Sequence, residues 1–404
     1  MPYSDIEAKS IQSLCTIVDC EHKTAPYVDK SEFLVVRTSN VRNGQLIMDD
    51  MKYTTQAGYD EWTQRAVPIH GDVLFTREAP AGESCLVPRE LKVCMGQRMV
   101  MLRPKTEKVD PVFLSLVLAT EKCKSDISRL SIGSTVSRIN ISDIKKLRVP
   151  SPPLPEQKKI AQILSTWDKA ITTTEQLLAN SQQQKKALMQ QLLTGKKRLL
   201  DKNGVRFQGE WKKVRLGNMA DMNSGGTPKS NIEEYYGGNI PWVSIADMTK
   251  QGKWISSTEK NLTELGLENS SARIYPKNSV LYAMYASIGE CSIAQVPLSS
   301  SQAILGIRPK SELNFEFLYF FLTSLKEKIK LQGQQGTQSN LNAGMVKDFV
   351  LYLPDMEEQQ KIVAVLAAAD QEITTLQQQL DQLKQEKKAL MQQLLTGKRR
   401  VLVS

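Results

Sequence analysis

The sequence contains few of the residues from which metal and catalytic centres are built. Only two histidines, His22 and His70, occur among 404 residues, and the six cysteines are scattered without a Cys-X-X-Cys pair. The nearest metal-like group, Cys20 with His22, lacks the second pair of ligands that a structural zinc site requires. We therefore expect no metal site and no disulfide framework, and we interpret the cysteines as reduced thiols.

Long hydrophobic runs are also missing. No stretch approaches the roughly 18 consecutive apolar residues that a membrane-spanning helix needs. The amino terminus, MPYSDIEAKS, lacks the basic and apolar segments of a signal peptide. These absences predict a cytoplasmic location.

Nucleotide-binding and methyltransferase motifs are absent as well. There is no G-x-x-x-x-G-K-S/T phosphate loop and no G-x-G-x-x-G dinucleotide fingerprint. The Asp/Asn-Pro-Pro-Tyr/Phe tetrapeptide of amino-methyltransferases is not found, and its nearest relative, SPPL at Ser151, lies in a linker. We therefore expect no catalytic residues and no cofactor bound by this chain.

What the sequence does have is a surplus of positive charge and enough apolar residues for large cores. Lys and Arg number 53 against 43 Asp and Glu, which gives a net charge of +10, and 41% of the residues are hydrophobic. The length allows two or more domains. The basic balance favours a polyanionic partner such as nucleic acid.

An internal repeat organises the chain. The segment KKALMQQLLTGK begins at Lys185 and again at Lys387, 202 residues later, which is half of the chain length of 404. The same offset relates Glu156 to Glu358. The chain is therefore a duplicated unit, in which a variable stretch is followed each time by a similar one. We place the boundaries at 1–150, 151–198, 199–352 and 353–404.

The similar stretches have the pattern of long helices. Proline and acidic residues open each of them, and Gly195 and Gly397 follow the last leucines as helix-ending residues. Two independent surface helices are possible, but seams this long favour a partner, and an antiparallel coiled-coil pair is the natural one. The predicted seam positions are Ile160, Leu164, Trp167, Ile171, Thr174, Leu178, Ser181, Lys185, Leu188 and Leu192, with Ile362, Leu366, Ala369, Ile373, Leu376, Leu380, Leu383, Lys387, Leu390 and Leu394 in the second copy.

The variable stretches predict mixed α/β domains. Short β-rich runs are separated by clusters of Gly, Pro, Asn and Ser. The expected strands are Phe33 to Val36, Asp72 to Phe75, Arg98 to Leu102, Ser279 to Tyr282 and Ala303 to Ile307, and the expected helices are Val112 to Ala119 and Phe315 to Lys328. The fold class is thus α+β: two similar mixed domains separated by two long antiparallel helices, with pseudo-twofold symmetry.

This arrangement resembles the specificity subunit of type I restriction-modification enzymes over essentially the whole chain. The resemblance rests on the doubled helix entries LPEQKKIAQIL and EEQQKIVAVLAAAD, the doubled KKALMQQLLTGK, the opening EWKKVRLGNMADMNSGGTPKS and the closing GTQSNLN. The first opening departs from the pattern, because CEHKTAP stands where the second copy has NSGGTP.

The resemblance implies that each variable stretch is a target recognition domain that reads one half of a bipartite, asymmetric DNA site. It further implies a chain that is not itself an enzyme. Two modification subunits, which carry S-adenosylmethionine and methylate adenine N6, would dock on the helices. A restriction subunit that uses ATP and magnesium could join them. The alternative is a coiled-coil scaffold that binds proteins, not DNA, through its two lobes.

Candidate DNA-binding residues are polar side chains in loops, because Arg and Lys suit guanine edges while Asn and Gln suit adenine. For each of them a turn-stabilising role is the competing interpretation. Gly225 and Gly226 could allow close approach of the backbone to a phosphate, or form a simple turn. The candidates are Arg37, Thr38, Asn40, Asn43, Arg77, Gln97, Arg98, Ser134, Thr135, Ser137 and Arg138 in the first domain, and Ser224, Gly225, Gly226, Thr227, Lys229, Tyr282, Tyr285, Gln302, Thr337, Gln338, Ser339 and Asn340 in the second.

Overall fold

The chain forms two compact units, one built from the two ends of the sequence and the other from its middle. The computed structural model describes residues 6–78, 80–132, 137–285, 287–334 and 341–402. One unit comprises Met1–Glu175 with Gln378–Ser404, and the other comprises Gln176–Gln377. Each unit therefore contains one variable domain together with part of each long helix.

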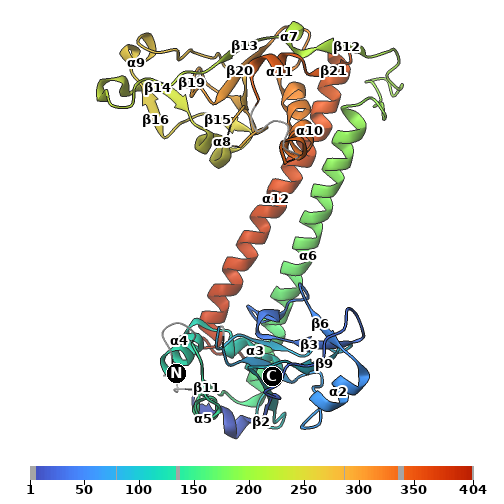
Figure 1. The fold of residues 1–404 in the computed structure, drawn as a ribbon, viewed down its shortest axis with the longest axis vertical. Helices are drawn as coiled ribbons and strands as arrows, with labels where there is room; N and C mark the ends of the chain where they lie inside the picture. The colour runs from blue at the N-terminus through green and yellow to red at the C-terminus, as the bar shows by residue number, and fades with distance from the viewer. Residues whose placement is uncertain (1–5, 79, 133–136, 286, 335–340, 403–404) are drawn as a thin grey trace. The chain divides into compact units, whose positions relative to one another are not determined.

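The two long helices are α6 (Leu154–Leu192) and α12 (Met356–Leu394), of 39 residues each (Figure 1). Every predicted seam position on both helices is buried or partly buried, whereas most of the positions between them are exposed. The predicted seams are confirmed. Each helix ends as expected, with Gly195 at φ +70° and Gly397 at φ +76°. In each case a backbone N–H beyond the glycine closes the last turn, Lys197 onto Gln191 and Arg399 onto Gln393.

The helices run antiparallel within each unit, as predicted. In the first unit Lys387 of α12 pairs with Asp168 of α6, and in the second unit Lys185 of α6 pairs with Asp370 of α12. These two ion pairs are related by the 202-residue repeat. The two seam lysines, Lys185 and Lys387, therefore each pair with a carboxylate on the opposite helix.

The first unit contains a sheet of strand order β2-β10-β7-β8 and a second sheet of order β6-β3-β9. Their strands are β2 (Cys15–Asp19), β3 (Phe33–Val36), β6 (Lys52–Thr54), β7 (Val73–Thr76), β8 (Ser84–Leu86), β9 (Lys92–Met95) and β10 (Met99–Pro104). The remaining elements are β1 (Ala8–Ser10), α1 (Ile11–Leu14), η1 (Thr38–Asn40), β4 (Val41–Arg42), β5 (Gln45–Leu46), α2 (Gln56–Trp62), α3 (Pro111–Leu118), α4 (Glu121–Leu130), α5 (Ile141–Lys146) and β11 (Arg148–Pro150).

The second unit repeats this plan with additions. Its main sheet has the order β13-β20-β17-β18-β15, and a second sheet has the order β16-β14-β19. The strands are β13 (Ala220–Ser224), β14 (Tyr236–Val243), β15 (Trp254–Ile255), β16 (Lys260–Leu262), β17 (Val280–Ala283), β18 (Cys291–Ala294), β19 (Ser299–Ser300) and β20 (Ile304–Pro309). The remaining elements are β12 (Lys212–Arg215), α7 (Leu216–Met219), η2 (Glu233–Tyr235), α8 (Ile245–Gln251), α9 (Glu264–Glu268), α10 (Phe315–Gln334), α11 (Ala343–Lys347) and β21 (Val350–Leu353).

The predicted strands and helices are found with boundaries shifted by at most two residues, except that α10 continues beyond Lys328 to Gln334. Strands β7 and β17 are buried along their whole length, since each lies inside its sheet and both faces are covered. The mixed α/β character of both variable stretches is therefore confirmed.

A buried glutamine anchors each long helix to its domain. The Gln157 carboxamide accepts from the Asp110 backbone N–H at 2.9 Å and donates to the Pro152 carbonyl at 2.8 Å. Gln359 makes the equivalent bonds to the Asn314 N–H at 2.8 Å and to the Pro354 carbonyl at 3.0 Å. The repeated Glu-Gln dipeptide at the helix entry thus has a structural role, because it satisfies buried backbone groups.

The six cysteines are free and buried. Burial raises the pKa of Cys15, Cys85, Cys94 and Cys123 to about 12, which makes these thiols poor nucleophiles near neutral pH. Among the described residues, no helix is long and apolar enough to cross a membrane.

Candidate nucleic-acid interface

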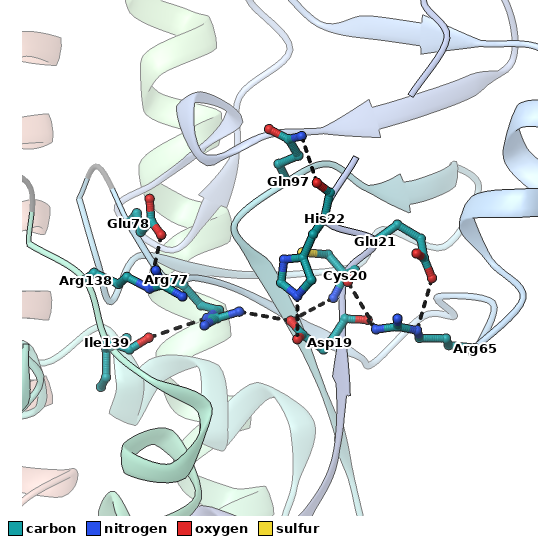
Figure 2. Close-up of polar contacts among 10 residues, drawn as sticks. All are labelled: Asp19, Cys20, Glu21, His22, Arg65, Arg77, Glu78, Gln97, Arg138 and Ile139. Carbon is teal, nitrogen blue, oxygen red and sulfur yellow. Dashed lines mark hydrogen bonds and ion pairs between the residues drawn. The ribbon is translucent and has the colours of Figure 1, made fainter. Parts of the chain in front are cut away.

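Four predicted DNA-binding residues of the first domain gather where β7 ends and where β9 turns into β10. Arg77 follows β7 directly, Gln97 and Arg98 form the turn, and Arg138 precedes α5. The backbone holds these segments together, because the Arg77 N–H donates to the Arg98 carbonyl at 2.9 Å and the Ile139 N–H donates to the Arg77 carbonyl at 3.0 Å. Figure 2 shows the side chains of this region, without Arg98.

Arg77 lies beneath this cluster and is not available at the surface. Its side chain is 7% exposed, with Nη1 at 3.2 Å from a carboxylate oxygen of Asp19. Its Nε donates to the Ile139 carbonyl at 3.4 Å (Figure 2). The burial of Arg77 favours a structural role over the predicted base contact.

Above Arg77, a carboxylate joins two exposed arginines. Glu78 Oε2 lies 3.0 Å from Arg98 Nε, and Glu78 Oε1 lies 3.3 Å from Arg138 Nε. The arginine side chains are 56% and 54% exposed. Nearby, the Gln97 side-chain amide donates to the His22 carbonyl at 3.2 Å, and the His22 ring contacts Asp19 (Figure 2). Arg98 and Arg138 are thus presented together at the surface, with the partly buried Gln97 beside Arg98 in the turn.

The predicted residues near β3 lie in a separate group. Arg37 is partly buried, and its Nη2 donates to the Asp50 carboxylate at 3.0 Å. Asn40 is fully buried and donates to the Ile47 carbonyl at 3.1 Å, which favours a structural role. Thr38 is partly buried and Asn43 is exposed. Of this group, Asn43 is the side chain most open to a ligand.

In the second domain the positions equivalent to Arg77, Glu78 and Arg98 carry neutral side chains. Met284 follows β17, and its N–H donates to the Ala303 carbonyl at 2.9 Å, as Arg77 does to Arg98. Tyr285, at the position of Glu78, is 39% exposed. Gln302, at the position of Gln97, is exposed.

The remaining predicted residues of the second domain differ in their exposure. Tyr282 is fully buried, which raises the pKa of its phenol and favours a core role. Thr227 joins the exposed group, because its hydroxyl accepts from the Gln302 backbone N–H at 3.5 Å. Ser224 and Lys229, which lie before and after Thr227 in the sequence, are also exposed.

The glycine pair of the second domain is required for packing. Both residues are buried, and a Cβ on Gly225 would lie 2.3 Å from the Ser300 carbonyl oxygen. A Cβ on Gly226 would lie 2.1 Å from the Ala272 nitrogen. The Gly226 carbonyl also accepts from the Trp242 indole at 2.9 Å. These contacts favour neither a phosphate site nor a simple turn, but close packing of backbone against backbone.

Six predicted residues fall outside the described part of the chain: Ser134, Thr135, Thr337, Gln338, Ser339 and Asn340. The described candidates with exposed side chains are Asn43, Arg98, Ser137, Arg138, Ser224, Thr227, Lys229, Tyr285 and Gln302.

Sequence reasoning missed three residues that organise the charged cluster: Asp19, Glu78 and Arg65. Arg65 donates to the backbone carbonyl of Cys20 at 3.2 Å and pairs with Glu21, which fixes the segment that carries His22 (Figure 2). Glu78 could have been noticed, because an acidic residue directly follows the candidate Arg77. Asp19 gave no such signal, since it ends an ordinary strand.

The described residues contain no group of three or more His, Cys, Asp or Glu side chains able to hold a metal ion. Between α6 and the second domain lies a basic run, made of Lys196, Lys197, Arg198, Lys202, Arg206, Lys212, Lys213 and Arg215. Arg198 pairs with Glu358 at 2.6 Å, and Arg215 pairs with Asp348 at 3.3 Å. These two arginines of the run therefore have carboxylate partners within the second unit.

Comparison with known proteins explains the duplicated architecture. The model of the type I restriction modification DNA specificity domain matches the chain twice, at residues 3–180 and 208–385. The putative type I restriction enzyme MjaX specificity subunit of Methanocaldococcus jannaschii is 25% identical, over 98% of this chain and 94% of that protein. The MjaIX specificity subunit of the same organism is 33% identical over 40% of this chain and 38% of the relative.

Solved structures share the fold. The S subunit of a type I restriction-modification system from M. genitalium superimposes with a TM-score of 0.59 at 16% identity, over 96% of each chain. A chain from a study of complex assembly and conformational transition of the type I R-M system gives a TM-score of 0.59 at 20% identity, over 96% of this chain and 97% of the other. Since the family model covers most of both halves, the protein belongs to the DNA specificity subunits of type I restriction-modification systems, which are non-catalytic.

Proposed function

We propose that the chain reads a bipartite, asymmetric site in double-stranded DNA, one half with each recognition domain. The observation that carries this proposal is a shared backbone frame with different side chains in the same loops. Equivalent main-chain hydrogen bonds hold Arg98 in one domain and Ala303 in the other, and Glu78 corresponds to Tyr285. Different donors on one frame are what recognition of two different half-sites requires. The net charge of +10 suits a phosphate backbone.

We further propose that two modification subunits bind to each copy of this chain. Two equivalent grooves support this ratio. In the first unit a groove of about 880 Å³ is lined in part by Asp168, Lys387 and Met391. In the second unit a groove of about 860 Å³ is lined in part by their repeat equivalents Asp370, Lys185 and Met189. Duplicated surfaces suit two copies of one partner.

The cofactors belong to the partners in this proposal. The modification subunits supply S-adenosylmethionine and methylate adenine N6, which requires the base to be flipped out of the duplex. Where restriction subunits join, they supply the ATP and magnesium chemistry. This chain contributes recognition and docking surfaces, and its own side chains carry out no covalent step.

Mapping of methyladenine tests the proposal. The chain is co-expressed with its modification subunit in a host without other adenine methylation. We expect methylation at one bipartite motif, and replacement of residues 1–150 by the domain of a relative should change one half of that motif. A motif altered in both halves would overturn the division of labour. A protein-binding scaffold would give no motif and no steep dependence of DNA binding on salt.

The subunit ratio is tested separately at the grooves. Met189→Glu and Met391→Glu each place a charge in one groove. Native mass spectrometry of the co-purified complex should show two modification subunits with the unaltered chain and one with either variant. Retention of both subunits by both variants would contradict the assignment of the grooves.

A further inference from the structure

In the charged cluster of Asp19, Arg77, Glu78, Arg98 and Arg138, Glu78 is the acidic residue that lies between the two exposed arginines. Its carboxylate lies between the Nε atoms of Arg98 and Arg138, at 3.0 Å and 3.3 Å, and its own side chain is only 17% exposed. The three residues come from three segments of the first domain: the loop after β7, the β9–β10 turn and the segment before α5. One carboxylate therefore fixes two guanidinium groups that are far apart in the sequence.

The backbone beneath these side chains is also fixed. Glu78 and Arg138 form an isolated antiparallel bridge. Arg98 has a φ of +67°, a left-handed conformation that residues other than glycine rarely adopt, and its carbonyl accepts from the Arg77 N–H at 2.9 Å. The ion pair of the buried Arg77 with the partly buried Asp19 supports the loop (Figure 2). Since strained backbone persists where its surroundings enforce it, the direction of the Arg98 side chain is a built feature.

The charges leave this group ready for an acceptor. Two guanidinium groups share one carboxylate, which leaves an excess of one positive charge, and both arginines are more than half exposed. The closest atom of each arginine to Glu78 is Nε, so the terminal Nη1 and Nη2 pair remains for a second acceptor. The O6 and N7 atoms of guanine are the base edge that a guanidinium group fits with two hydrogen bonds.

The described positions of the second domain that correspond to Glu78 and Arg98 lack this arrangement. The backbone bonds that position Glu78 and Arg98 recur there, yet they hold Tyr285 and Ala303. Neither of these residues is charged. Any function of the Glu78 group must therefore be confined to the half-site that the first domain reads.

We propose that Glu78 is a specificity-determining positioning residue, which holds Arg98 and Arg138 against guanine edges in the first half-site. This inference rests on the proposed DNA-reading function. The carboxylate does not contact DNA itself. It acts by restricting the arginines to one direction, which lowers the entropy that they lose on binding and prevents them from moving to the nearest phosphate.

The test uses the full chain in complex with its modification subunit, and compares Glu78→Gln with Glu90→Gln, an exposed control in the same domain. Glu78→Gln preserves the shape of the side chain and removes its charge. We expect discrimination against substitution of guanine in the first half-site to fall about tenfold, the order of one bidentate base contact. The second half-site should be unaffected, and the control should match the unaltered chain. Competition binding with single-base oligonucleotide variants measures this.

Arg98→Ala and Arg138→Ala provide a second measurement at exposed positions, where folding is least sensitive. Each should relax the same base positions as Glu78→Gln. Three outcomes would overturn the inference: a first half-site without guanine, discrimination unchanged in all three variants, or a loss of affinity that is uniform across sequences, as a phosphate contact gives. Failure of the proposed function looks different, because then the unaltered chain itself directs methylation to no bipartite motif.

Discussion

The two recognition domains have one backbone plan and two sets of side chains. In the first domain the loop after β7 carries Arg77, whose charge is balanced in the interior by Asp19. In the second domain the same place is held by Met284, which is 2% exposed. The loops keep their form because main-chain hydrogen bonds hold them, and these bonds do not depend on side-chain identity. A duplicated domain can therefore change what it reads without changing its fold.

The helix ends show the opposite behaviour, since their side chains have been kept in both copies. Arg198 forms a two-point ion pair with Glu358 at 2.6 and 2.7 Å. The repeat equivalent, Arg400 with Glu156, is also bonded through two nitrogens. Residues that support the common architecture are held constant, and residues on the loop surface differ. Four predictions test this contrast.

The largest effect is expected at the buried helix-end carboxylates. Arg198→Met should lower the free energy of unfolding by about 3 kcal/mol, because it leaves the Glu358 carboxylate, 1% exposed, without its cation. Arg400→Met should cost less, since the Arg400 side chain is 36% exposed against 20% for Arg198. Urea denaturation followed by circular dichroism measures both. Arg215→Met, in an exposed pair with Asp348, is the control and should be nearly neutral. Equal losses at Arg198 and Arg400 would show that burial does not set the cost.

The domain openings should differ in their tolerance of a methyl group. Gly226→Ala forces a Cβ against the backbone of Ala272 and should destabilise the second unit by about 1–3 kcal/mol. Thr24→Ala, 202 residues earlier in the first domain, changes an exposed side chain and should have little effect. Thermal unfolding of the two variants decides this. Similar melting curves would mean that the packing of the glycine pair relaxes at little cost.

The paired glutamines allow a matched test of recognition. Gln97 precedes Arg98, whose carbonyl accepts from the Arg77 N–H after β7. Gln302 precedes Ala303, whose carbonyl accepts from the Met284 N–H after β17. The two glutamines therefore occupy equivalent positions. Glutamine suits adenine, and a good base contact contributes about 1–3 kcal/mol of discrimination. Gln97→Ala should relax only the first half-site, and Gln302→Ala only the second. Binding competition with variant oligonucleotides measures each, and a change in the opposite half-site would break the assignment of one domain to one half-site.

The smallest effect is expected at the interhelical ion pairs. Lys185 with Asp370 and Lys387 with Asp168 are repeat equivalents, and all four side chains are partly exposed. Double-mutant cycles with alanine should give a coupling of about 0.5–1 kcal/mol for each pair. The two values should agree within error and fall as salt is raised. A large difference between them would show that the helix pair is less symmetric than its sequence.

The sequence by itself determined the duplication, the helix seams and the α/β character of the domains. Ile160 and Leu394 could be assigned to the interior because apolar periodicity is a local property, and Gly195 because a helix end needs a left-handed residue. The resemblance to the specificity-subunit family rested on the same repeated segments.

Only the tertiary structure decided which polar loop side chains are exposed and able to contact a ligand. The sequence predicts that Arg77 is a donor at the surface. In the structure it is buried, and Asp19, 58 residues earlier, supplies its counter-charge. The sequence predicts either a phosphate contact or a simple turn at Gly226, whereas in the structure the absence of a side chain makes room for Ala272. Glu78 joins Arg98 to Arg138 because three loops meet at one end of a sheet. Such contacts depend on partners distant in the chain, and local sequence patterns contain no information about which distant residues meet.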